Sequence, residues 1–227
     1  MRDMQPVELE MFLDVSCPWC HGALGTNRRV LDEFAADPAL PPLAITWRFQ
    51  RLHPMPAAEG ISVTSLHAGY AKGDPDAAAA MLQSAFDYVE SVGARIDSER
   101  YTWVHDPETA HRLLAIVRDD GGHDLPDLWS LARVVWSANF VGGIDITDPA
   151  ALRRAVEDGG LQLPERIWSL LEQPDGHLAV TLADHDRALE VGLDGVPRIV
   201  VGGTIVPTWV DPSEVRASLR AAISSAG

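Results

Sequence analysis

Outside one short segment, the chain has no cysteine. Its 227 residues contain only Cys17 and Cys20. No third thiol can pair with either one, and a bridge between them would close too small a loop to constrain the unfolded chain much. A large domain in a reducing cytosol also has no need of a structural disulfide. The pair therefore indicates chemistry rather than a structural crosslink.

Long apolar runs and an excess of positive charge are also missing. Nowhere do about 18 apolar residues follow one another, so no membrane span is predicted. Glu8, Glu10 and Asp14 lie within the only apolar segment of the first sixteen residues, which therefore does not predict a signal peptide. The chain has 18 Lys and Arg against 33 Asp and Glu, and its net charge of −15 disfavours binding to nucleic acid and to anionic lipid. We expect a cytoplasmic protein with neither as its partner.

The remaining composition is that of a folded globular protein, with 46% hydrophobic and 22% charged residues. Both ends of the chain predict α/β structure. Apolar residues alternate before the cysteines as in a strand, and Pro18 then fits the first turn of a helix. The elements predicted at the two ends are strands at 7–15 and 43–49, a helix at 18–34, a hairpin at 198–207 and a helix at 211–223.

The middle of the chain predicts helices only, most of them bounded by Pro, Asp or Gly. They span 76–93, 109–119, 127–140, 149–157, 164–171 and 177–192. This layout predicts one α/β domain, formed by residues 1–75 and 193–227, that is interrupted by an inserted helical domain at 76–192.

The spacing of the two cysteines suits a redox pair. Side chains three apart on a helix share one face, within the range that a disulfide bridges. Cys17 is expected at the helix N-terminus, where free N–H groups and the helix dipole stabilise a thiolate and lower its pKa. Cys20, one turn further on, is expected to be buried. Cys17 would then attack a disulfide, and Cys20 would resolve the mixed disulfide.

Other interpretations of Cys-Pro-Trp-Cys-His remain open at this point. The same pattern serves for c-type haem attachment, which expects export and an axial ligand. A zinc site needs about four ligands, and only His105 and His111 approach the spacing of a second pair. An inert buried pair is the third alternative. We expect neither a metal nor a cofactor.

The strand, the C-P-W-C motif at a helix start, the helical insertion and a late G-V-P segment together resemble the thioredoxin superfamily. The chain is most similar to the DsbA-like oxidoreductases, in particular their cytoplasmic FrnE-like branch, which is related to the 2-hydroxychromene-2-carboxylate isomerases. The phrases that carry the resemblance are CPWC from Cys17, FQRLHP from Phe49, AHRL from Ala110, NFVGGIDI from Asn139 and GVP from Gly195. The resemblance implies a thioredoxin-like fold with a large all-helical insertion.

The resemblance also implies roles for individual residues. Cys17 is the nucleophile, Cys20 the resolving thiol and Pro197 a cis-proline that faces them. Val196, just before it, would offer its backbone to an extended substrate. Pro18 and Trp19 lie between the thiols, where we expect them to contact substrate. Three further tryptophans fit the apolar faces of the inserted helices as packing residues: Trp129, Trp136 and Trp168.

The sequence departs from the family in its proton acceptor. Thioredoxins and DsbA carry a buried carboxylate six positions before the first cysteine, where this chain has Met11. Asp14 lies nearer, but strand alternation predicts that it faces the other way. Proton transfer to and from Cys20 would then need water, His21 or another group, although His21 points about 100° away from Cys20 on a helix.

These observations favour a thiol–disulfide oxidoreductase that acts on thiol or disulfide substrates through a mixed disulfide. We expect a redox potential less oxidising than that of periplasmic DsbA, because no extra cationic group lies beside Cys17. One alternative is a small-molecule isomerase or tailoring enzyme that uses a low-molecular-weight thiol. The related isomerases have serine where Cys17 stands, so the intact pair argues against it. A second alternative is a chaperone-like module that binds apolar peptide near Trp19.

Overall fold

The computed structural model describes residues 5–52, 60–206 and 211–226, without the side chain of residue 226. His53 and Pro54 of the quoted motifs and Pro207 of the expected hairpin lie outside the described residues. No helix in the described part of the chain combines the length and the apolar character that crossing a bilayer requires.

A four-stranded sheet in the order β2-β1-β5-β6 forms the centre of the fold. β1 (Val7–Leu13) pairs in parallel with β2 (Leu43–Phe49), as expected for two strands joined by a crossover helix. On its other side β1 pairs antiparallel with β5 (Arg198–Val201), and β5 pairs antiparallel with β6 (Thr204–Ile205). The first and last parts of the chain therefore build one sheet.

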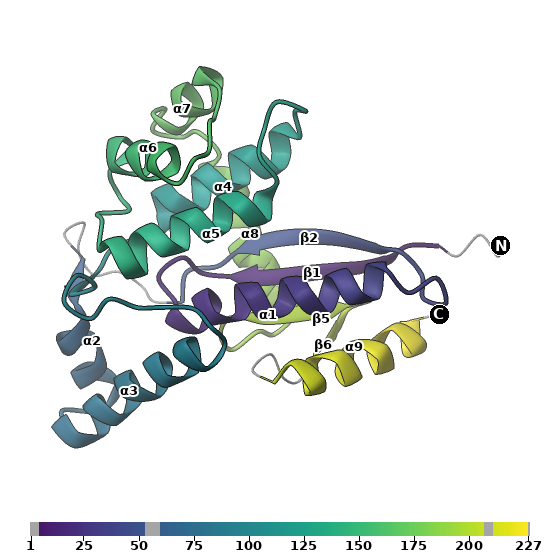
Figure 1. Cartoon of the computed structure of the whole chain (residues 1–227), viewed down its shortest axis with the longest axis horizontal. Helices are drawn as coiled ribbons and strands as arrows, with labels where there is room; N and C mark the ends of the chain where they lie inside the picture. The colour runs from purple at the N-terminus through teal and green to yellow at the C-terminus, as the bar shows by residue number, and fades with distance from the viewer. Residues whose placement is uncertain (1–4, 53–59, 207–210, 227) are drawn as a thin grey trace.

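Helices cover both faces of this sheet. α1 (Pro18–Ala35) and α9 (Pro212–Ala226) contact one another on one face, and α8 (Leu178–Glu190) lies against β2 on the other face (Figure 1). This is the α/β thioredoxin-like fold of the sequence prediction, with a helical insertion between its strands.

The insertion, taken as the whole segment between β2 and β5, is mainly helical and projects from one end of the sheet (Figure 1). Its remaining elements are β3 (Ile61–Ser62), α2 (Val63–Tyr70), α3 (Pro75–Ser91), β4 (Trp103–Val104), α4 (Glu108–Asp120), α5 (Leu128–Ser137), the π-helix η1 (Ala138–Gly142), α6 (Pro149–Asp158) and α7 (Glu165–Leu171). The six predicted helices of the middle are present. α2, the short β3–β4 pair and the π-helical turn were not predicted.

The proposed division into two domains stays a prediction. β3 lies in the first predicted domain and pairs with β4 of the predicted insertion. The buried hydrophobic residues also form one continuous cluster that extends from the sheet into the inserted helices. Side chains of the inserted helices can therefore reach the end of β1, where the cysteines follow.

Candidate active site

Cys17 caps the N-terminus of α1. Its backbone is extended (φ −92°, ψ 116°), Pro18 occupies the first helical position, and the Cys17 carbonyl accepts the N–H of His21 at 3.2 Å. The helix therefore begins at the nucleophile candidate, as predicted. Both cysteines are free thiols with no exposed surface, so each sulfur is reached only through the groups around it.

The loop before β5 contacts Cys17. The Val196–Pro197 peptide bond is cis, as the resemblance implied. The Cys17 thiol donates to the Val196 carbonyl, with Sγ and O 3.7 Å apart. Residues 179 positions apart in the sequence are thus brought together at the Cys17 sulfur.

Cys20 lies one turn behind Cys17 in α1 and is fully buried. Burial raises its pKa well above that of a free thiol, and the hydrogen bond and negative charge of Cys17 raise it further. The Asp14 backbone N–H donates to Cys20 Sγ at 3.4 Å. At neutral pH Cys20 is therefore held as a thiol behind the nucleophile candidate.

The sequence prediction for Asp14 was wrong. β1 ends at Leu13 and a turn at Val15 and Ser16 follows, so strand alternation no longer applies to Asp14. The Asp14 side chain is completely buried, and its carboxylate accepts the N–H groups of Ser16 (2.7 Å) and Leu52 (2.6 Å). A buried carboxylate is therefore present, three positions before Cys17 rather than six.

The charge state of Asp14 follows from its partners. Burial alone would raise its pKa, but the hydrogen bond and charge of His111 and the two backbone N–H donors outweigh burial and lower it. His111 Nε2 lies 3.2 Å from Asp14 Oδ1, and only 1% of the His111 side chain is exposed. Asp14 is thus an ionised carboxylate paired with a buried histidine.

Two side chains of the insertion hold the turn before Cys17. His111 Nε2, on α4, accepts the N–H of Val15 at 3.1 Å, and Asn139 Nδ2, in the π-helix, donates to the Val15 carbonyl at 3.0 Å. The backbone N–H and the carbonyl of the buried Val15 are thereby both hydrogen-bonded by side chains of the insertion. The motifs around residues 110 and 139 carried the family resemblance, but nothing in the local sequence showed that these two residues converge.

His21 does not face the cysteines. Its Nε2–H donates to the Arg95 carbonyl at 3.0 Å, and its ring stacks on Phe140 with centroids 5.1 Å apart. Burial lowers its pKa. The proton-transfer role that the sequence left open for His21 has no support in this geometry.

An apolar pocket of about 580 Å³ adjoins the start of α1. Pro18 and Trp19 line it together with side chains of the insertion, among them Tyr70, Met81 and Tyr101. The Trp19 ring stacks on Tyr88 at 4.9 Å. Trp19 therefore lies in a pocket wall two residues after Cys17, and its contact with a substrate stays a prediction.

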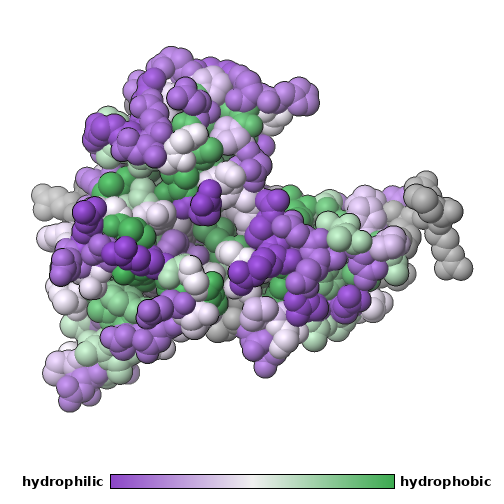
Figure 2. Space-filling view, in the orientation of Figure 1, coloured by the Kyte–Doolittle hydropathy of each residue, from purple (hydrophilic) through white to green (hydrophobic). Residues whose placement is uncertain are grey.

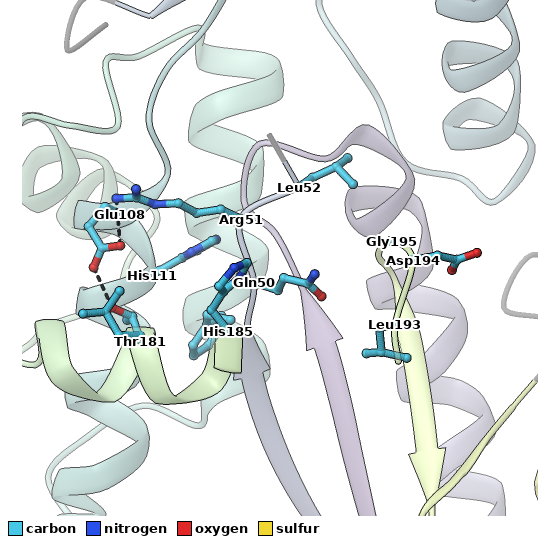
Figure 3. A pocket seen from close by; sticks show the side chains of 12 residues that line it. Gln50, Arg51, Leu52, Glu108, His111, Thr181, His185, Leu193, Asp194 and Gly195 are labelled. Carbon is cyan, nitrogen blue, oxygen red and sulfur yellow. Dashed lines mark hydrogen bonds and ion pairs between the residues drawn. The ribbon is translucent and has the colours of Figure 1, made fainter. Parts of the chain in front are cut away.

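A second, more polar pocket of about 460 Å³ lies on the other side of Leu52, which lines both. His111 forms part of its wall, and Gly195, next to Val196, forms another part (Figure 3). Arg51 pairs with Glu108 at 2.9 Å within it. The buried acid–base pair thus borders one pocket, and Trp19 borders the other.

Burial is the main cause of the raised pKa values of the tyrosines around the cysteines. Burial and then the charges of Cys20 and Cys17 raise the pKa of Tyr88 to about 12. Burial followed by the charges of Cys17 and Asp14 raises the pKa values of Tyr70 and Tyr101. These phenols remain neutral at physiological pH.

No metal centre forms among the residues that the structure describes, since nowhere do three His, Cys, Asp or Glu side chains gather as ligands would. The two histidines of the zinc alternative each contact an aspartate. His105 Nδ1 lies 3.4 Å from Asp145 Oδ1, and His111 contacts Asp14.

The family model for the DSBA-like thioredoxin domain matches residues 8–220 of the sequence, almost the whole chain. The chain belongs to the DSBA-like thioredoxin domain family. It is a DsbA-like disulfide oxidoreductase, and its CXXC pair is Cys17 and Cys20. A comparison with curated proteins gave no match.

Solved structures share this fold at low sequence identity. A probable DsbA oxidoreductase from Streptomyces coelicolor superposes with a TM-score of 0.79 at 19% identity, covering 96% of this chain and 90% of that one. A candidate protein disulfide isomerase from Nitrosomonas europaea has a TM-score of 0.72 at 20% identity, covering 98% and 100%. The cytosolic disulfide reductase DsbM from Pseudomonas aeruginosa has a TM-score of 0.62 at 14% identity, covering 96% and 99%.

Proposed function

We propose that this DsbA-like protein is a cytoplasmic disulfide reductase in which Cys17 is the nucleophile and Cys20 the resolving thiol. One observation carries the proposal. Cys17 caps α1 and its sulfur faces the carbonyl before the cis-proline, while Cys20 is buried behind it as a thiol. The two sulfurs are equally buried, but Cys17 lies at the helix end beside the Val196 carbonyl and Cys20 lies one turn further into the helix.

In the first step, the Cys17 thiolate attacks one sulfur of a substrate disulfide. A bond forms between Cys17 and that sulfur, the substrate S–S bond breaks, and the leaving thiolate takes a proton from water. The Val196 carbonyl, which accepts from the thiol before reaction, becomes free to accept a backbone N–H of the bound substrate. Pro197 fixes the direction of that carbonyl, and Pro18 and Trp19 contact the substrate side chains.

In the second step, Cys20 loses its proton and attacks Cys17, releasing the second substrate thiol and leaving a Cys17–Cys20 disulfide. We assign the proton to the Asp14–His111 pair. Unprotonated His111 Nε2 accepts the Val15 N–H, and protonated Nε2 donates to the ionised Asp14 carboxylate. The Asp14 carboxylate lies 3.2 Å from His111 Nε2, where it stabilises the transferred proton. The polar pocket beside His111 gives the proton a path outward.

The proposed direction of electron flow, from glutathione to the substrate disulfide, depends on a reducing compartment. Reduction of the resulting disulfide needs an external thiol, which the cytosolic glutathione pool supplies. The acidic composition of the chain and the similarity to a cytosolic disulfide reductase support this location. The motifs in the sequence further support membership of the FrnE-like branch.

One observation favours a second candidate, a small-molecule isomerase or tailoring enzyme that uses a low-molecular-weight thiol. The apolar pocket beside Cys17 has the size of a small-molecule site. A structure of DsbM with GSH also shares the fold, with a TM-score of 0.60. The intact cysteine pair favours the reductase.

Reduction of insulin by glutathione separates the candidates. Cys17→Ser should remove turnover by at least about 1,000-fold, because it removes the nucleophile. Cys20→Ser should instead accumulate a mixed disulfide between Cys17 and substrate, which intact-protein mass spectrometry detects. Full activity of Cys17→Ser in glutathione-dependent isomerisation of an aromatic substrate, with no insulin reduction by the wild type, would support the second candidate instead.

A further inference from the structure

Two adjoining pockets that do not include the cysteines are lined by arginine. The first, of about 560 Å³, lies between α1, α5 and the segment after α3, and is lined by Arg28, Arg29, Arg95 and Arg133. The second, also about 560 Å³, is lined by Arg100, Arg133 and Arg154. Arg133, Ser137 and Val141 line both pockets. We call the two together the arginine groove.

The arginine groove has few acidic groups of its own. Asp127 lines the first pocket and Asp158 the second. Arg28 is neutralised, because it pairs with Asp32 at 2.8 Å and with Asp127 at 3.5 Å. Arg29 and Arg133 form no ion pair with any other residue that the structure describes.

The other arginines are paired weakly. Arg95 and Arg100 share one carboxylate, that of Asp97, at 3.3 and 4.0 Å, and 73% and 67% of their side chains are exposed. Arg154 lies 3.8 Å from Asp148. Exposed pairs of this kind contribute little, so the guanidinium groups can exchange these partners for a ligand.

This concentration of positive charge opposes the charge of the whole chain. Besides the neutralised Arg28, five of the 18 Lys and Arg residues line the groove of a protein whose net charge is −15. Strongly hydrophilic surface borders the hollow between α1 and α5 on the face shown in Figure 2. Like charges gathered in one groove repel one another unless an anion lies between them.

We propose that the arginine groove binds an elongated small molecule that carries two or more linked phosphate groups. Arginine forms paired hydrogen bonds with phosphate, and its planar geometry favours phosphate over a point-like anion. Each pocket has the volume of a small-molecule site, and the shared Arg133 places cations along both. A ligand with separated charges uses both pockets, whereas a single phosphate fills only one.

The proposal is independent of the disulfide chemistry. Neither pocket includes Cys17, Cys20 or Pro197 among its lining residues. Binding should therefore be unchanged in Cys17→Ser, so that a failure of the redox proposal and a failure of this one are distinguishable.

Isothermal titration calorimetry with tripolyphosphate, pyrophosphate and orthophosphate, at one ionic strength of about 0.15 M, tests the proposal. We expect affinity to rise with the number of linked phosphates. Arg133→Gln should weaken tripolyphosphate binding by at least about tenfold, and the Arg29→Gln, Arg133→Gln double variant by about 100-fold. The melting temperature without ligand should not fall in these variants, because they remove unpaired like charges.

Arg216→Gln is the matched control, since Arg216 lies on α9 and pairs with Glu33 at 2.6 Å. It should bind tripolyphosphate as the wild type does. Three results would overturn the proposal: no saturable binding at millimolar tripolyphosphate, equal affinity for all three phosphates, or equal losses in Arg133→Gln and the control. Tighter binding of a polyglutamate peptide than of tripolyphosphate would overturn the small-molecule assignment.

Discussion

The thioredoxin-like part and the inserted helices contribute differently to the same site. The sheet and α1 place the two sulfurs and the cis-proline. The insertion supplies His111 and Asn139, which hold the turn before Cys17, and most of the apolar pocket wall. The cysteines and the side chains that surround them therefore come from different parts of the chain. Variants on each side of this boundary should therefore fail in different ways.

The largest effect is expected where the two parts meet, at Asp14. Asp14→Asn removes a buried charge that His111 and two backbone N–H groups require, so the free energy of unfolding should fall by about 3 kcal/mol. Urea unfolding at pH 7 measures this change. Asp87→Ala, on the exposed surface of α3, is the control and should change stability by less than about 0.5 kcal/mol.

The pH dependence gives this prediction a second readout. Because folding lowers the pKa of Asp14, its ionised form stabilises the protein above the unfolded pKa of about 3.9. That contribution is lost as the pH falls through the lower pKa of the folded state. The stability difference between the wild type and Asp14→Asn should shrink over that range, and a constant difference down to about pH 2 would contradict the assigned charge.

The next effect concerns proton transfer. His111→Gln keeps a side chain that can accept the Val15 N–H but cannot take a proton, so attack by Cys20 should slow by about 100-fold. Attack by Cys17 on substrate should be unchanged. Stopped-flow release of the first and second substrate thiols, measured across pH, separates the two steps.

A purely structural role of His111 would slow both steps without changing their pH dependence, and that result would exclude the proposed proton transfer. His177→Gln is the control. His177 precedes α8 and lies 3.7 Å from Asp119, away from the residues that hold the cysteines. It should leave both steps as in the wild type.

The smallest effect is expected in the apolar pocket. Trp19→Ala removes one wall of this pocket, so KM for a disulfide peptide with apolar flanking residues should rise by about tenfold. The kcat for a small hydrophilic disulfide should change little. Trp103→Ala removes an equally large side chain that is 49% exposed on β4, and it should alter neither constant. An equal loss for both substrates would remove Trp19 from substrate recognition.

Local patterns were sufficient for most of the framework. Alternating apolar residues predicted β1, Pro18 predicted the start of α1, and the spacing of Cys17 and Cys20 predicted their shared face. The six predicted helices of the middle are present because each repeats apolar residues at helical spacing and has its own stop signals. α2 and the β3–β4 pair were missed because they are short and lack such repeats.

The surroundings of the sulfurs were decided only by the tertiary structure. The direction of the Asp14 side chain depends on a turn that ends the strand one residue earlier, and strand alternation cannot show this. His111 lies 97 positions after Asp14, and only packing of α4 against the end of the sheet brings the two together. A sequence determines local conformation through short-range sterics and periodicity. Contacts between distant segments depend on how whole elements pack, which no local pattern encodes.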